Sequence, residues 1–175
     1  MTFSLQEGRQ ILAGTPAALR GTLAGLSDAW LVADEGPGTW TPWQALAHLT
    51  HIEEEDWLGR VETILAHGPE EVLGPVDREA GFERFAGWSV GRVLDRFAEL
   101  RASNLARLDE LGVGEDDLAR IGRHGDFGPV TLAQLLATWT VHDLNHESQI
   151  VKTLAKRYRD AVGPWREFLG VVDLP

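Results

Sequence analysis

Residues 131–150 read TLAQLLATWTVHDLNHESQI, a segment with the start signal and the periodicity of a long helix. It opens with a capping box, because the Thr131 hydroxyl can accept a bond from an unpaired N–H while the Gln134 side chain bonds the N–H of Thr131. At 100° per residue the apolar side chains form one stripe, made of Leu132, Leu135, Leu136, Trp139, Ile150 and Leu154. The segment predicts an amphipathic helix over about residues 131–161 that packs against other helices.

Three further main helices follow from the same kind of signal. A second capping box, Thr41 to Gln44 with Pro42 at the first helical position, starts a helix over about 42–67. The dipeptide Gly68-Pro69 ends it, because glycine accepts the left-handed conformation and proline cannot continue a helix. The other two are expected over about 4–32, with a break at Thr15-Pro16, and over about 89–111.

The connections between these helices are long. Residues 68–87 are expected to hold a short helix near 78–85, the glycine-rich residues 122–130 to be extended, and a short piece to follow Pro164. No sustained strand alternation is present. The expected fold is therefore all-α: a four-helix bundle in one domain, 1–175, with long connections after the second and third helices.

Composition excludes several classes of function. The chain of 175 residues has 16 basic and 27 acidic side chains, a net charge of −11, which disfavours nucleic acid and anionic membrane surfaces as partners. No cysteine is present, so disulfides, thiolate metal sites and a cysteine nucleophile are excluded. A leader sequence and a run of about 18 apolar residues are both lacking, so the cytoplasm is the expected compartment.

Two histidines on the long helix indicate where chemistry could occur. His142 and His146 are spaced i, i+4 on the apolar side, so both imidazoles should point into the bundle. An unpartnered polar group costs several kcal/mol there, and a shared metal ion would remove that cost. The spacing alone is weak, since six histidines should give about 0.2 such pairs by chance. Gln149 or Asp143 could orient a ligand imidazole.

A third ligand would have to come from another helix. His48 is the best candidate, His51 is its rival, and Glu55 projects on the same side as a general base or a fourth ligand. Trp40 and Trp43 precede His48 and could wall an apolar pocket.

The two remaining histidines have simpler interpretations. His67 stands beside a helix end, where a cation complements the dipole, and is interpreted as structural. His124 falls in a loop and is interpreted as solvated.

Two blocks of sequence resemble the DinB-like (YfiT-like) superfamily of four-helix-bundle metalloproteins. The N-terminal block is Trp40-Thr41-Pro42 followed by Ala47-His48-Leu49. The more specific C-terminal block comprises Gly128 to Leu132, Leu135 to Ala137, Val141 to His146 with Gln149-Ile150, and a tail from Tyr158 to Trp165. The resemblance covers essentially the whole chain. One departure is Glu147-Ser148, where relatives often carry smaller or apolar residues.

The resemblance implies a ligand set and a class of activity. The family's three metal histidines correspond to His48, His142 and His146, which selects His48 over His51. Members are described as metal-dependent hydrolases, or as transferases and isomerases that use a small thiol such as bacillithiol, mycothiol or glutathione. The family name does not imply DNA binding.

Three functions follow from such a site. A divalent ion, Zn²⁺ or Ni²⁺ ahead of Fe²⁺ or Cu²⁺, would lower the pKa of an incoming thiol for transfer to an electrophile, which is the favoured interpretation. The alternatives are hydrolysis by metal-activated water with Glu55 as base, and a non-catalytic metal- or small-molecule-binding bundle. The expected partners are a small thiol and an electrophile, and bundles of this kind commonly form homodimers.

Overall fold

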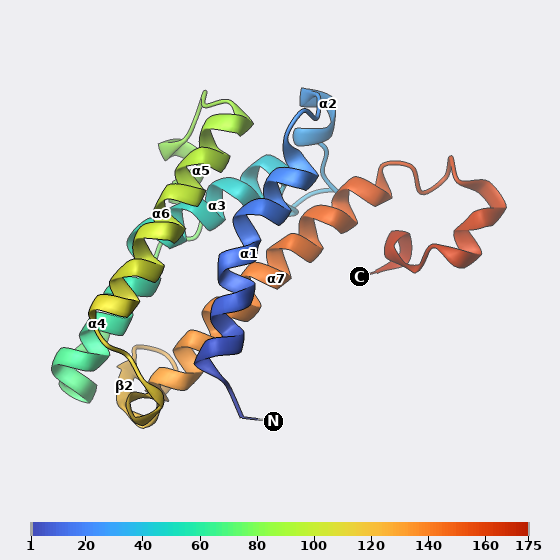
Figure 1. The fold of residues 1–175 in the computed structure, drawn as a ribbon. Helices are drawn as coiled ribbons and strands as arrows, with labels where there is room; N and C mark the ends of the chain where they lie inside the picture. The colour runs from blue at the N-terminus through green and yellow to red at the C-terminus, as the bar shows by residue number, and fades with distance from the viewer. Residues whose placement is uncertain (1, 175) are drawn as a thin grey trace.

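The computed structural model describes residues 2–174, and most of them are helical (Figure 1). The bundle is built from α1 (Leu5–Leu23), α3 (Pro42–Glu55) continued by α4 (Trp57–His67), α6 (Val90–Glu110) and α7 (Leu132–Lys156). Both α1 and α3 pack mainly against α6 and α7, so the two successive helices α1 and α3 occupy opposite corners. The expected four-helix bundle is confirmed.

The first helix differs from the expectation. A break was expected at Thr15-Pro16, but α1 continues through Pro16 and ends at Leu23, and a separate short α2 (Asp28–Leu31) follows. Pro16 has no N–H to give the carbonyl of Leu12, four residues earlier. That carbonyl instead accepts a hydrogen bond of 2.7 Å from the guanidinium of Arg101 on α6. A tertiary contact thus compensates for the missing helical bond.

Two other helices have different bounds from those expected. The predicted helix 42–67 is interrupted at Asp56, where the backbone leaves helical geometry between α3 and α4. The last helix ends at Lys156 rather than near 161, and the tail continues through the 3₁₀ helices Gly163–Phe168 and Gly170–Asp173. In Figure 1 the tail runs outward from the end of α7 and turns back toward it.

A small sheet was not expected from the sequence. β1 (Val72–Leu73) pairs in parallel with β2 (Ile121–His124), which pairs antiparallel with β3 (Gly128–Thr131). Strands of two to four residues are too short to show a period-2 pattern. The sheet brings together the two long connections, which also contain the 3₁₀ helices Gly68–Glu70 and Glu115–Ala119.

The first long connection also contains the expected short helix, α5 (Ala80–Arg84), which packs on α3. A Cβ at Gly81 would lie 2.5 Å from the carbonyl oxygen of Ala47 and 2.9 Å from the Cβ of His51, so only glycine permits this approach. The close packing of α5 holds the preceding residues over the middle of α3.

The apolar core has two parts, and polar residues lie between them along α3 and α7. One part contains Ile52, Trp57, Leu132 and Trp139, and the other contains Leu46, Leu49, Phe97 and Ile150. Among the described residues, none of the helices combines the length and the hydropathy that a membrane span requires.

Candidate metal centre

Three histidines meet between the two parts of the core. His48 comes from α3, and His142 and His146 come from successive turns of α7. The Nε2 atoms of His48 and His142 are 3.1 Å apart, and one nitrogen from each ring lies within 4.8 Å of the other two. His48 is 1% and His146 4% exposed, while His142 is half-buried. We call these residues the triad.

The partners of two triad rings determine which nitrogen carries the proton. Nδ1 of His48 lies 2.7 Å from the carbonyl oxygen of Arg78, and Nδ1 of His146 lies 2.7 Å from Oε1 of Gln149. A carbonyl oxygen can only accept, so both Nδ1 atoms donate, and in a neutral ring Nε2 is then a bare lone pair. An oxygen acceptor that fixes the tautomer of a ligand imidazole is typical of metal-binding histidines.

Electrostatics keeps these rings neutral. Burial lowers the pKa of His48 to about 4 and that of His142 to about 3, and it lowers the pKa of His146 as well. The positive charge of Arg78 disfavours protonation of all three rings. At neutral pH the triad therefore offers unprotonated nitrogens, the form that binds a metal ion.

The residues present fit a divalent ion. Imidazole nitrogens bind Zn²⁺ at about 2.0–2.1 Å, so two nitrogens 3.1 Å apart can share one ion. Nδ1 of His142 is buried and has no hydrogen-bond partner among the described residues. Three facing imidazoles with unused lone pairs are costly in a protein interior, and a shared cation would satisfy them.

Aromatic rings flank the triad on two sides. Trp40 lies with its ring centroid 4.8 Å from that of His48 and stacks on His146 at 5.8 Å. Trp57, at the start of α4, meets His142 edge-on at 5.2 Å. Trp40 thus flanks the triad, but it borders a polar cleft rather than the expected apolar pocket, and Trp43 packs in the core around Leu46.

Two hollows reach the triad. An apolar cavity of about 250 Å³ has His48 and His142 in its wall, together with Trp57 and Leu135. A more polar cleft of about 490 Å³ has His146 in its wall, beside Trp40. Small molecules thus have space on both sides of the triad.

A buried ionic network lies beside the triad on the same helices. The Arg101 guanidinium, 1% exposed, bonds both carboxylate oxygens of Glu53 at 2.8 Å and those of Asp143 at 2.6 and 3.1 Å. Asn104 and the indole N–H of Trp139 complete the bonding of Glu53. We call these five residues the ionic network, and it ties α3, α6 and α7 together.

The structure places several predicted residues away from the triad. Glu55 is exposed and forms an ion pair of 2.7 Å with Arg84, so its position does not support a role as base or ligand. Asp143 pairs with Arg101 rather than with a ligand imidazole, whereas Gln149 does orient His146 as expected. His51 is buried outside the triad.

The two other histidines also have defined positions. His67 ends α4, is exposed and lies 3.4 Å from Glu71, in keeping with a structural role. His124 is not a solvated loop residue: it belongs to β2, stacks on Phe127 at 4.6 Å and borders the apolar cavity.

Three residues near the triad were not singled out from the sequence as site residues. Arg78 holds His48 through its carbonyl, Trp57 packs on His142, and Asp56 is the acidic residue in the wall of the apolar cavity. Asp56 is 8% exposed and pairs with Arg60. Burial raises its pKa, although the charge of Arg60 opposes the shift. Sequence reasoning had no signal for Asp56, because the interruption between α3 and α4 was not predicted and the residue lies in a run of acidic side chains.

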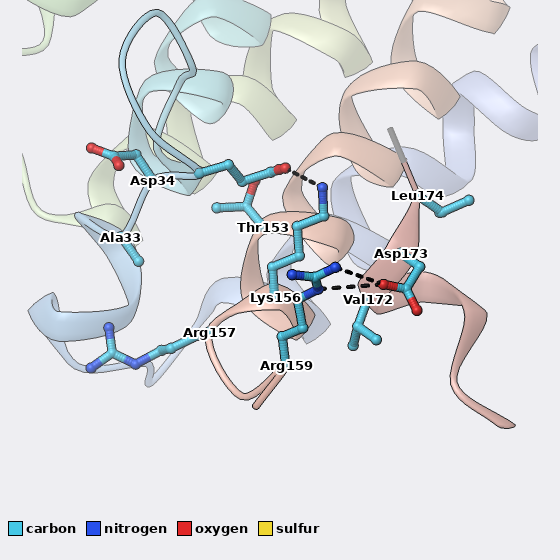
Figure 2. Close-up of a pocket in the computed structure, with 10 residues that line it drawn as sticks. Ala33, Asp34, Thr153, Lys156, Arg157, Arg159, Val172, Asp173 and Leu174 are labelled. Carbon is cyan, nitrogen blue, oxygen red and sulfur yellow. Dashed lines mark hydrogen bonds and ion pairs between the residues drawn. The ribbon is translucent and has the colours of Figure 1, made fainter. Parts of the chain in front are cut away.

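Another hollow, of about 570 Å³, lies at the far end of α7 (Figure 2). No triad residue lines it, and four of its charged side chains form ion pairs. Lys156 pairs with Glu35 at 2.7 Å, and Arg159 pairs with Asp173 at 3.1 Å. The first pair joins the residue 33–35 loop to α7 and the second joins two parts of the tail, so both have a structural role.

Comparison with solved structures supports this fold. YfiT from Bacillus subtilis, described as a probable metal-dependent hydrolase with an unusual four-helix bundle topology, matches with a TM-score of 0.75 and 23% identity over 87% of this chain and 86% of that one. TT2238, described as a four-helix bundle protein, matches with a TM-score of 0.54 and 20% identity over 82% of this chain and 95% of that one.

Comparison of sequences gives the family. No curated protein matches the chain. The model of the DinB superfamily, however, matches residues 11–150, which contain the whole triad, all of α3 and α7 as far as Ile150. The chain belongs to the DinB superfamily.

Proposed function

We propose that the protein is a divalent-metal-dependent enzyme that transfers a low-molecular-weight thiol to an electrophilic substrate. One observation carries the proposal: three neutral imidazoles converge between two hollows, with the Nδ1 protons of His48 and His146 donated to oxygen acceptors. Three histidine ligands leave coordination positions open, the pattern of a catalytic rather than a structural site. An ion held there would lower the pKa of a bound thiol.

The chain's own residues would perform the remaining tasks. Arg78 and Gln149 fix the ligand rings, while Trp40 and Trp57 shield the triad from bulk water. The two hollows would hold the two substrates on either side. In the transfer a sulfur–carbon bond forms as the carbon–leaving-group bond breaks, and the leaving group departs with the electron pair. The thiol proton passes to solvent.

Hydrolysis is a second candidate, because one carboxylate does lie beside the triad. Asp56 borders the same cavity as His48 and His142, and burial raises its pKa toward the range of a general base. Asp56 would accept a proton from water as the water oxygen bonds to an ester carbonyl carbon, and would return that proton to the leaving oxygen as the acyl carbon–oxygen bond breaks. This candidate needs no thiol.

The test is turnover with defined metals and thiols. Zn²⁺- or Ni²⁺-loaded protein would be assayed with a halonitrobenzene and bacillithiol, mycothiol or glutathione, and separately with a nitrophenyl ester without thiol. Thiol transfer predicts turnover that a chelator abolishes and that His142→Ala reduces at least a hundredfold. His51→Ala is the matched control, because His51 is buried on α3 outside the triad.

The other outcomes separate the alternatives. Ester cleavage without thiol, lost in Asp56→Asn, would favour hydrolysis. Thiol turnover that persists in His142→Ala would contradict the metal–thiol mechanism. Metal that raises Tm without turnover of either substrate class would leave a metal-binding bundle as the function.

A further inference from the structure

The apolar cavity beside the triad is shaped for a small, mostly apolar body. Its volume of about 250 Å³ lies just below the usual range of ligand pockets. Most of its wall is aliphatic or aromatic, contributed by Ile52, Trp57, Leu73, Val76, Val130 and Leu135. Contact with such a wall stabilises an apolar group in proportion to the area removed from water.

The charged groups around the cavity differ in whether an opposite charge lies beside them. Asp56 and Arg60 form an ion pair with each other, and Arg60 also donates to the carbonyl of Gly74 at 2.9 Å. Arg78 borders the cavity too, but among residues 2–174 no carboxylate lies within ion-pair distance of its guanidinium. Arg78 is therefore the cation at this cavity whose charge no carboxylate among residues 2–174 neutralises.

Arg78 is held close to the triad at both ends. Its carbonyl accepts the proton of His48 Nδ1 at 2.7 Å, and its guanidinium lies 5.4 Å from the ring centroid of Trp40. It borders the polar cleft as well as the apolar cavity, so its charge stands where the two hollows meet the triad. This positive group is notable in a chain of net charge −11.

We propose that the apolar cavity binds an electrophile with an apolar body and one carboxylate, and that the Arg78 guanidinium binds the carboxylate. The inference rests on the proposed thiol transfer and names the class of its electrophile. Guanidinium is suited to this task, because its planar N–H groups match the two carboxylate oxygens. Arg78 is an exposed residue whose guanidinium lies over the ring of Trp40, so a ligand can reach its N–H groups.

Binding of two matched probes tests the role of Arg78. Phenylacetate and phenylacetamide have nearly the same shape and differ in charge, and their Kd values would be measured by calorimetry with metal-free and Zn²⁺-loaded protein. Arg78→Gln should weaken phenylacetate binding about tenfold in both forms and change phenylacetamide binding less than twofold. The hydrogen bond to His48 uses the backbone of residue 78 and should survive the substitution.

The matched control is Arg92→Gln. Arg92 is also exposed, also stacks on a tryptophan, Trp88, at 3.5 Å, and changes the net charge equally when replaced. The Arg92→Gln substitution should leave the Kd values of both probes unchanged. The proposal is overturned if Arg78→Gln weakens both probes equally, if it weakens neither, or if Arg92→Gln has the same effect.

A second pair of variants tests where the apolar body lies. Thr138 is an exposed residue of α7 in the wall of the cavity, and Thr138→Phe should fill it and weaken both probes at least tenfold. Ser148→Phe adds the same ring on an exposed position of the same helix, outside the residues that line the cavity. It should have no effect. Unchanged binding in Thr138→Phe would place the probes elsewhere and overturn the proposal.

These measurements are independent of turnover. If thiol transfer fails but Arg78→Gln still removes the preference for phenylacetate, only the proposed reaction is wrong. Suppose instead that the enzyme turns over, but that neither the metal-free nor the Zn²⁺-loaded protein binds phenylacetate more tightly than phenylacetamide. The carboxylate proposal is then wrong and the thiol transfer stands.

Discussion

Two buried polar clusters on the same helices differ in how completely their atoms are paired. In the ionic network the guanidinium of Arg101 and the carboxylates of Glu53 and Asp143 satisfy one another. In the triad, Nε2 of His48 lies 3.1 Å from Nε2 of His142, a nitrogen of His146 lies within 4.8 Å of a nitrogen of each, and Nδ1 of His142 has no hydrogen-bond partner among the described residues. His142 and Asp143 are neighbours in sequence, yet one belongs to each cluster, because successive helical residues point about 100° apart. The first cluster is complete without a ligand, and the second is not.

The largest effect should follow from breaking the complete cluster. Arg101→Met leaves Glu53 and Asp143 as buried carboxylates without a counter-charge, which should cost about 3–5 kcal/mol of unfolding free energy. Urea unfolding would measure the loss. Arg96→Met is the control: Arg96 pairs with Glu54 at a half-exposed position, and its loss should cost less than about 1 kcal/mol. Equal losses of unfolding free energy in the two variants would contradict the distinction between the buried ionic network and a half-exposed ion pair.

The incomplete cluster should respond to metal instead. At a free Zn²⁺ concentration a hundred times Kd, the ion should stabilise the wild-type fold by about 2.7 kcal/mol, seen as a rise in Tm. His146→Ala should lose most of this gain, and Arg96→Met should keep it, since its ion pair lies outside the triad. A rise in Tm that is the same in His146→Ala and wild type would place the ion at another site.

The buried histidines of the triad also predict how pH affects the stability of the metal-free protein. An unfolded histidine has a pKa near 6.5, whereas His48 and His142 in the fold have pKa values of about 4 and 3. Between these values the unfolded chain binds protons that the folded chain does not, so the unfolding free energy should fall as pH is lowered from about 6.5 to 4. The slope is at most about 1.4 kcal/mol per pH unit for each histidine.

Urea unfolding of chelator-treated protein at pH 7.5 and 5.0 measures this loss. His142→Asn should show a shallower pH dependence than wild type. Stability that is unchanged between the two pH values would be inconsistent with buried neutral imidazoles.

The smallest effect should come from the exposed ion pair between Glu55 and Arg84, which belongs to neither cluster. Glu55→Gln removes only a contact with Arg84 and should change the unfolding free energy by less than about 1 kcal/mol. Its Zn²⁺ affinity, measured by titration, should equal that of wild type. A large loss of Zn²⁺ affinity in Glu55→Gln would indicate that Glu55 is a metal ligand after all.

Much of the fold could be predicted because its signals are local. The capping boxes at Thr41 and Thr131 lie where expected, each with both reciprocal hydrogen bonds. The continuity of α1 through Pro16 could not be predicted, because it depends on a bond from Arg101, 89 residues away from Leu12. The three-stranded sheet likewise depends on pairing between distant short segments.

The triad could be predicted in part. The i, i+4 spacing and the apolar stripe indicate His142 and His146, but the choice of His48 over His51 needed the family resemblance. Local sequence could not place Arg78, which reaches the triad only because Gly81 allows α5 to pack on α3. Local sequence could not place the ionic network either, because Glu53 belongs to an acidic run, residues 53–56, and is nevertheless buried by contacts with α6 and α7.

The central claim is that the triad holds one divalent ion, and metal titration with X-ray absorption spectroscopy tests it most directly. Protein loaded with Zn²⁺ or Ni²⁺ should bind one ion per chain, with three imidazole nitrogens around the metal. His48→Ala should lose one of these ligands and lower the affinity at least tenfold, while His51→Ala should match wild type. Failure of the chain to bind a stoichiometric ion, or a ligand set that His48→Ala leaves unchanged, would contradict the account.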